Sequence, residues 1–112
     1  MTSQEEAQLF AQASSGKNPA ALESLQVAAN NGYAVAQFNL GAVYANGQGV
    51  PQNYAIAYAL FNLAAVGDTK DSINRDSISQ QMTEAAIESG QNLTRMMQSL
   101  GVTAAINAYS SK

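Results

Sequence analysis

Residues that could do chemistry are few in this sequence, and they lack the neighbours that such chemistry needs. Glu84 and Glu88 lie one helical turn apart, but nothing nearby would tune such a pair for proton transfer. The serines at 14–15 and 110–111 have no base to activate them, because the chain contains no histidine. Cysteine is absent as well, which removes thiol nucleophiles and thiolate metal sites. We therefore expect a non-enzymatic protein that uses no cofactor and no metal.

Two further patterns have a structural and a functional interpretation. Gly47-Gln48-Gly49 has the glycine spacing that begins a phosphate-binding loop, but it follows a helical pattern and lacks both a third glycine and a lysine. A turn between two helices is the better interpretation. The methionines at 82, 96 and 97 could line an adaptable groove for a partner helix, although filling of the core is the expected role.

Charged residues are sparse, and the basic ones do not cluster. They make up 12% of the chain, against about 25% in a typical domain, and the net charge is −3. Residues 24–67 contain no Asp, Glu, Lys, Arg or His, whereas Asn and Gln occur there ten times. Nucleic acid is an unsuitable partner, because phosphate binding needs clustered Lys and Arg. The longest apolar run, residues 54–61, falls far short of the ~20 residues of a membrane span, so no membrane insertion is expected.

Periodicity and capping signals predict helices along the whole chain. Ser3 and Glu6 form a capping box, Asn18 before Pro19 starts a second helix, and Asn53 caps a fourth. An alternation of period two persists nowhere, so the chain is expected to be all-α. The expected helices are 3–14, 19–31, 33–45, 54–66, one that begins at 68, one that is capped by Thr83 and ends before Gly101, and 102–109.

The helix predicted at 33–45 has two apolar faces. Val35, Phe38 and Ala42 form one of them, and Gln37 and Asn39 lie between it and the other. The opposite face consists of Tyr33, Ala36, Leu40, Val43 and Tyr44. Two apolar faces predict packing on both sides, and the helix at 54–66, apolar around nearly its whole circumference, is predicted to be buried.

The glycine-rich segment between these two helices is predicted to be a hairpin loop. Gly47 and Gly49 permit positive φ, and Pro51 stiffens the loop and lowers the entropy lost on ordering. Gly41, which has no side-chain bulk, lets the two helices approach closely. A shift of 36 residues aligns 21–29 with 57–65, and a glycine follows each segment. The chain therefore contains a two-helix unit that is repeated.

Residues 28–68, AANNGYAVAQFNLGAVYANGQGVPQNYAIAYALFNLAAVGD, resemble one complete Sel-one-like repeat, a relative of the tetratricopeptide repeat. Asn53 stands where that family usually has Asp, and Leu60 or Phe61 where it has a large aromatic residue. Residues 74–96 resemble the helical tail that closes bacterial members, with Glu84 in place of a proline. The positions that match the repeat pattern are Ala29, Gly32, Ala36, Gln37, Leu40, Gly41, Tyr44, Gly47, Gly49, Val50, Ala57, Ala64 and Ala65.

The resemblance implies a short right-handed α-solenoid of antiparallel helix-turn-helix repeats with a C-terminal helical cap. Single units of this kind cannot bury their apolar faces alone, so they stack. One domain is expected, with a degenerate repeat at 3–31, a complete Sel-one-like repeat at 32–67 and capping helices at 68–112.

The function implied by the resemblance is a scaffold-like module for protein–protein interaction, which holds a protein or peptide on its concave surface. In such arrays the first helix of a repeat lines that surface, which makes Gln37 and Asn39 candidate contact residues. Tyr54 and Tyr58, one turn apart on the next helix, are further candidates. A neutral surface of this kind selects a partner by shape and hydrogen bonds, with little electrostatic steering.

Two other functions stay open at this point. An immunity protein or other inhibitor that neutralises one bacterial toxin or enzyme would bind one partner tightly, whereas an adaptor would bind several weakly. A cell-wall hydrolase, an activity proposed for relatives, has no residues here to support it. The oligomeric state is open, as is the choice between a cytoplasmic and an exported protein. The first residues lack a secretory signal, but low charge with many amides points toward a soluble, exported bacterial protein.

Overall fold

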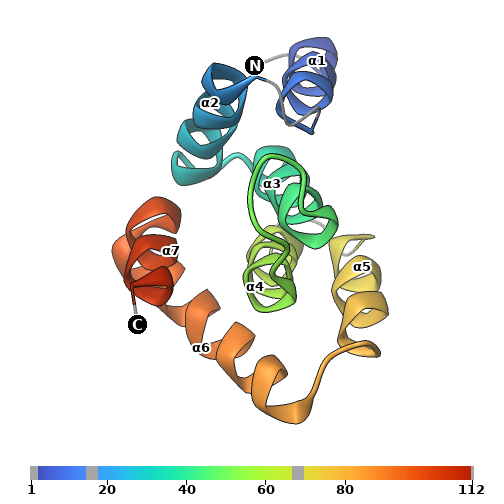
Figure 1. The fold of residues 1–112 in the computed structure, drawn as a ribbon, viewed down its shortest axis with the longest axis vertical. Helices are drawn as coiled ribbons and strands as arrows, with labels where there is room; N and C mark the ends of the chain where they lie inside the picture. Colours follow the sequence, from blue (N-terminus) through green and yellow to red (C-terminus); the bar gives the residue numbers. More distant parts are fainter. Residues whose placement is uncertain (1–2, 15–17, 67–69, 112) are drawn as a thin grey trace.

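The computed structural model describes residues 3–14, 18–66 and 70–111 of the 112-residue chain. Their regular structure is helical throughout, without a strand in these ranges, which confirms the all-α prediction. The predicted start of a helix at Asp68 lies outside the described residues, as do the side chains of the predicted capping box. The helices are α1 (Ser3–Ser14), α2 (Pro19–Asn30), α3 (Ala34–Asn46), α4 (Tyr54–Ala65), α5 (Lys70–Ser79), α6 (Glu84–Leu100) and α7 (Val102–Ser110) (Figure 1).

Local capping and turn chemistry explains where several of these helices begin and end. Gly47 ends α3 in the left-handed conformation with φ of +68°, and Gly49 follows with φ of +83°, as the hairpin interpretation requires. At three predicted N-caps the side-chain oxygen accepts a hydrogen bond from the backbone N–H three residues later. These pairs are Asn18 with Ala21 at 3.0 Å, Asn53 with Ile56 at 3.0 Å, and Thr83 with Ala86 at 3.1 Å.

Helix α4 lies at the centre of the molecule and contacts α3, α5 and α6. Its predicted burial is confirmed, because all residues from Ala55 to Phe61 are buried. Gly41 lets α3 approach α4 closely, since a Cβ on Gly41 would lie 2.8 Å from Cε1 of Phe61. The radius of gyration of 12.7 Å is close to the roughly 13 Å expected for a globular chain of this length.

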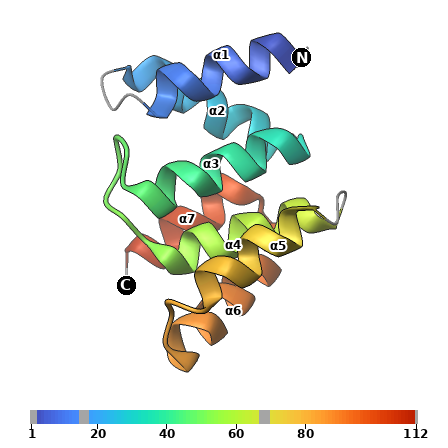
Figure 2. The ribbon, with the colours of Figure 1, turned by 90° about the vertical axis from the view of Figure 1, so that its right-hand side faces the viewer.

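The helices before α6 follow one another as packed neighbours. Helix α1 contacts α2 and α3, and α2 contacts α3 in turn. Figure 2 shows α1, α3 and α5 one below another on the side that faces the viewer, with α7 behind α3 and α4. Helices α1 and α2 span the segment predicted as a degenerate repeat, and α3 and α4 span the segment predicted as a complete repeat.

The C-terminal helix returns to the N-terminal half of the chain. Helix α7 contacts both α6 and α2, and the backbone N–H of Thr103 donates to Oδ1 of Asn30 at 3.3 Å. Val102, Ala105 and Ile106 of α7 are buried in the common core. The segment that was predicted to cap the repeats thus contacts α2, 73 residues away along the chain at this hydrogen bond.

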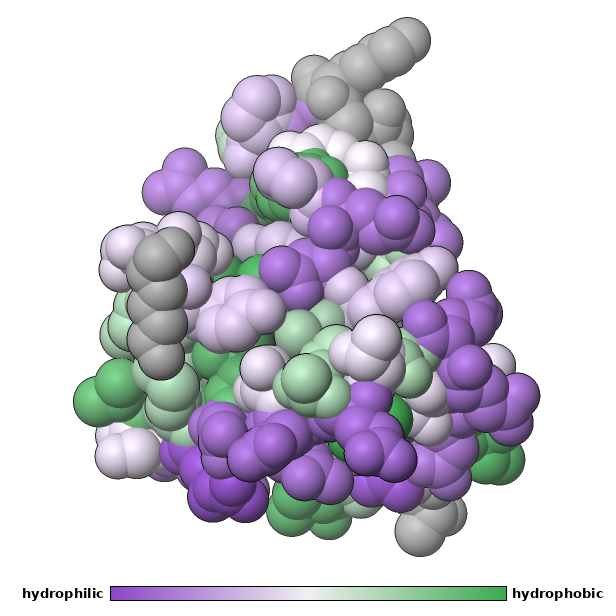
Figure 3. Space-filling view, turned by 60° about the horizontal axis from the view of Figure 1, so that its bottom comes forward, coloured by the Kyte–Doolittle hydropathy of each residue, from purple (hydrophilic) through white to green (hydrophobic). Residues whose placement is uncertain are grey.

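The outer surface mixes polar and apolar residues. On the face drawn in Figure 3, hydrophobic residues lie in several separate areas between hydrophilic ones. Isolated apolar side chains of this kind are normal on a protein surface. Among the helices of the described ranges, none has the length and the apolar character needed to cross a membrane.

Candidate functional site

Two of the predicted contact residues are buried inside the molecule. The side chains of Gln37 and Asn39 are only 7% and 9% exposed, so the prediction that these amides form an open contact surface is wrong. Gln37 Nε2 donates to the backbone oxygen of Ala29 at 3.1 Å, near the C-terminus of α2. The same carbonyl also accepts from the Gly32 N–H at 3.1 Å, so the amide of Gln37 adds a second hydrogen bond that ties α3 to the end of α2.

The two predicted tyrosines have different surroundings. Tyr58 is buried, which corrects the expectation of partial exposure. Tyr54 is half-buried, and its hydroxyl donates to Oε1 of Gln81 at 3.3 Å, which connects the start of α4 with the segment before α6. Because α3 and α4 run antiparallel, Gln37 and Tyr54, each near the start of its helix, lie at opposite ends of the hairpin. The structure therefore does not join the four candidates into one site.

The residues predicted as the structural motif are mostly buried between helices or lie in turns at the helix ends. Gly41 and the larger motif residues are buried between helices, Ala65 is half-buried, and Gly32 has a φ of +93° after α2. Glycine is the residue that adopts such a φ without strain. The buried motif residues are Ala36, Leu40, Gly41, Tyr44, Ala57 and Ala64.

One side of α3 is only partly covered by its neighbours, and we call it the α3 face. It consists of Val35, Phe38 and Ala42, which helical spacing places on the side opposite Tyr44. Val35 is 48% exposed, and the other two are half-buried. The ring of Phe38 packs against Phe61, with centroids 5.3 Å apart and planes inclined by 39°. The sequence identified these three residues as a second apolar face, and the structure leaves this face only partly covered.

A further exposed apolar side chain, Val66, lies at the end of α4. Gly41 lies opposite Leu60 and Phe61, which fixes the register of the antiparallel pair. This register places Val35 and Val66 at the same end of the hairpin, and Val66 is 78% exposed. The start of α3 and the end of α4 thus each carry an exposed valine, and single exposed apolar side chains are normal on a protein surface.

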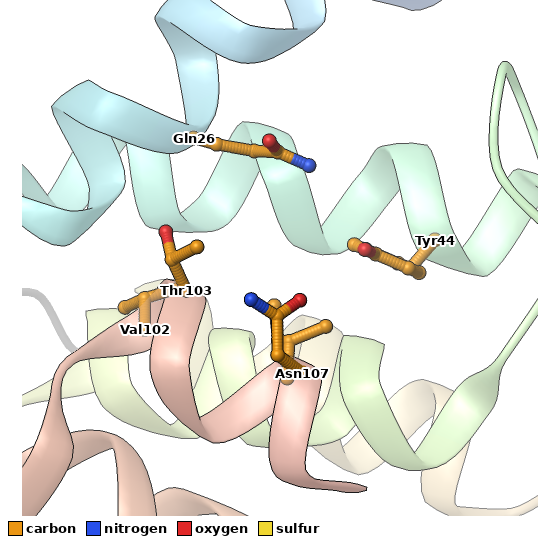
Figure 4. A pocket seen from close by; sticks show the side chains of 6 residues that line it. Gln26, Tyr44, Val102, Thr103 and Asn107 are labelled. Carbon is orange, nitrogen blue, oxygen red and sulfur yellow. The ribbon is translucent and has the colours of Figure 1, made fainter. Parts of the chain in front are cut away.

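A small pocket lies on the other side of α3, where α2, α3 and α7 meet. The amides of Gln26 and Asn107 and the hydroxyl of Tyr44 point into it (Figure 4). Burial raises the pKa of the Tyr44 hydroxyl above its ordinary value. The cavity measures about 60 Å³, whereas pockets for drug-sized ligands measure about 300–1,000 Å³. It can hold a few waters or a small group of a partner.

The two acidic residues of the predicted pair lie at the protein surface. Glu84 and Glu88 are both exposed on α6, where solvent surrounds the carboxylates. Three or more Asp, Glu, His or Cys side chains do not come together anywhere in the described ranges in a way that could hold a metal ion.

Comparison with known proteins adds no relative to this picture. Neither a protein-family model, nor a curated protein, nor a solved structure matches the chain. The resemblance to Sel-one-like repeats accordingly rests on the motif residues of 28–68, and the candidate site on its geometry. That geometry favours the α3 face, because exposed Val35 and half-buried Phe38 and Ala42 leave apolar side chains accessible there.

Proposed function

We propose that this protein is a non-enzymatic module that binds a protein or peptide partner through the α3 face. The observation that carries this proposal is the half-exposed Val35 beside half-buried Phe38 and Ala42. These side chains form an apolar face on a helix whose opposite face, from Ala36 to Tyr44, is buried in the core. Covering such surface is favourable by about 25 cal/mol per Å² of apolar area removed from water.

The composition of the surrounding elements defines the chemistry of the partner. Residues 24–66, which include α3 and α4, carry no Asp, Glu, Lys, Arg or His. The partner is therefore an apolar, uncharged protein or peptide surface, recognised by shape and with little electrostatic steering. The pairs α1–α2 and α3–α4 would act as short Sel-one-like repeats that present this face, an assignment that the motif residues support.

A matched pair of substitutions tests the location of the binding surface. Val35→Arg places a charge on the α3 face, and Val27→Arg places the same charge on α2 at a similar exposure of 54%. We expect affinity capture from the source cell to recover a partner with the native chain and with Val27→Arg, but not with Val35→Arg. Calorimetric titration of the purified partner then measures the loss directly.

Circular dichroism of both variants shows whether the fold is intact. Substitution of Asn39 would be a poorer test, because a charge at this buried position would disturb the core. A partner that binds the Val35→Arg chain as tightly as the native chain would place the binding surface elsewhere. Equal loss in both variants would show that added charge, and not the α3 face, is responsible.

A further inference from the structure

Helix α7 is joined to the rest of the molecule by a single residue. Gly101 ends α6 and precedes α7 with φ of +93° and ψ of +161°, a conformation that is essentially restricted to glycine. A Cβ on Gly101 would also lie 2.9 Å from Oδ1 of Asn30. The sharp corner between α6 and α7 therefore depends on one glycine, and the two helices would form one long helix if this residue became helical.

The contact between α7 and the N-terminal half is modest. Three apolar side chains of α7 are buried, and the backbone N–H of Thr103 donates to Oδ1 of Asn30 on α2 at 3.3 Å. The contact is also incompletely packed, because the pocket lined by Gln26, Tyr44 and Asn107 lies within it (Figure 4). Water can enter such a polar-lined space, whereas Val102, Ala105 and Ile106 are buried, so a released α7 would have to bury these three side chains again.

If α7 separated from the rest of its own chain, it would have to dock at an equivalent site to become stable again. Nine residues are too few for a helix that is stable alone in water. Its apolar side, Val102, Ala105 and Ile106, is buried in the core where α7 contacts α2 and lies beside Tyr44 of α3, and we call this site the groove. The groove of a second copy is identical, and neither α7 nor residues 24–66 carry Asp, Glu, Lys or Arg that would oppose the approach of two copies.

We propose that two copies of this chain exchange their α7 helices. In the exchanged dimer Gly101 continues α6 into α7, and each α7 fills the groove of the other copy. Each α7 makes the same contacts as in the single chain, but with the other copy. Because the dimer has two-fold symmetry, both grooves are filled and no further copy can add. This dimer is independent of the α3 face, which lies on the opposite side of α3.

Two single-cysteine chains provide the direct test, because the native chain contains no cysteine. One chain carries Asn30→Cys and the other Thr103→Cys, and the two are mixed at high concentration and oxidised. A disulfide between the two chains forms efficiently only if α7 of one copy occupies the groove of the other. Ala104→Cys in place of Thr103→Cys is the control, since Ala104 is the exposed next residue on α7.

Light scattering on full-length chains gives the second measurement. Alanine at position 101 cannot adopt the backbone conformation of the corner without strain, which disfavours the single folded chain. Gly101→Ala should therefore raise the association constant of the dimer by roughly tenfold or more. Adding Ala105→Asp, which prevents docking of α7 in either copy, should abolish this dimer.

Efficient cross-linking of the Asn30→Cys and Thr103→Cys chains, well above the Ala104→Cys control, supports the exchange even if Gly101→Ala does not fold. Cross-linking no greater than this control overturns the proposal, as does a folded Gly101→Ala chain that stays monomeric from micromolar to millimolar concentration.

Discussion

Tyr58 on α4 lies directly against Gly90 on α6. A Cβ on Gly90 would stand 2.6 Å from Cδ1 of the Tyr58 ring and 3.3 Å from the backbone oxygen of Ala55. The tyrosine is 7% exposed, so its ring is enclosed by this close approach of the two helices. Glycine inside a helix is intrinsically unfavourable, and its presence in the middle of α6 is explained by the ring that occupies the space of its side chain.

This relationship predicts that Gly90→Ala destabilises the protein. Alanine would gain about 1 kcal/mol in helix propensity, but the clash with Tyr58 should produce a net loss of about 1–3 kcal/mol. Urea unfolding followed by circular dichroism measures the change. Gln91→Ala, at an exposed neighbouring position, is the control and should alter stability by less than about 0.5 kcal/mol. A more stable Gly90→Ala chain would show that the ring can move aside.

The cap at the start of α4 provides a second test. Asn53→Ala removes the oxygen that accepts from the Ile56 N–H at 3.0 Å, and it should lower the free energy of unfolding by about 0.5–2 kcal/mol. Asn53→Asp keeps the acceptor and adds a negative charge at the positive end of the helix dipole, so it should be at least as stable as the native chain. An Asn53→Ala chain with native stability would contradict a capping contribution.

A hydrogen-bonded chain of side chains connects α5, α4 and α6. Arg75 Nη1 donates to Asn62 Oδ1 at 2.7 Å, and Asn62 Nδ2 donates to Thr94 Oγ1 at 3.3 Å. Thr94→Val leaves the Asn62 amide without this acceptor and should cost about 1–3 kcal/mol of stability. Thr103→Val, at an exposed threonine of α7, is the control. Equal unfolding midpoints for the two variants would mean that the hydrogen bonds of the Thr94 hydroxyl do not stabilise the fold.

The buried hydroxyl of Tyr44 predicts a dependence of stability on high pH. Burial raises the pKa of Tyr44 in the folded protein above the value of about 10 that applies to the unfolded chain. The stabilising contribution is therefore complete below pH about 10 and is lost as the pH rises through the folded-state pKa, because the unfolded chain releases its proton first. Urea unfolding between pH about 9 and about 11 should show this loss.

Tyr44→Phe should reduce the slope of stability against pH in this window. Tyr33→Phe is the matched control, since Tyr33 is 47% exposed, and it should leave the slope unchanged. An identical slope in the native chain and in Tyr44→Phe would show that Tyr44 does not contribute to the alkaline loss of stability.

The parts of the fold that the sequence predicted well depend on near neighbours along the chain. Asn18 and Asn53 cap helices because each side chain reaches an N–H three residues away. Gly47 ends α3 for an equally local reason, since its backbone adopts a positive φ. Helical periodicity likewise predicted the buried α4 and the second apolar face of α3. None of these inferences requires knowledge of which elements meet in space.

The candidate contact residues show where sequence reasoning was insufficient. Gln37 and Asn39 are polar, and composition alone favours their exposure, yet both are buried because α3 is enclosed on that side. Tyr58 could not be assigned without knowing that Gly90 lies against it, and a lone glycine in α6 was the signal that was overlooked. Val35 was correctly placed on an apolar face, but its exposure depends on what covers that face.

The sequence by itself determined an all-helical chain, the limits of most helices and an uncharged middle segment, because these properties follow from dihedral preferences, capping groups and residue types acting over a few positions. Only the tertiary structure decided that α7 returns to α2 at Asn30 and that the α3 face stays only partly covered. Contacts between residues far apart in the chain depend on how whole helices pack together, and no local pattern specifies which faces they leave uncovered.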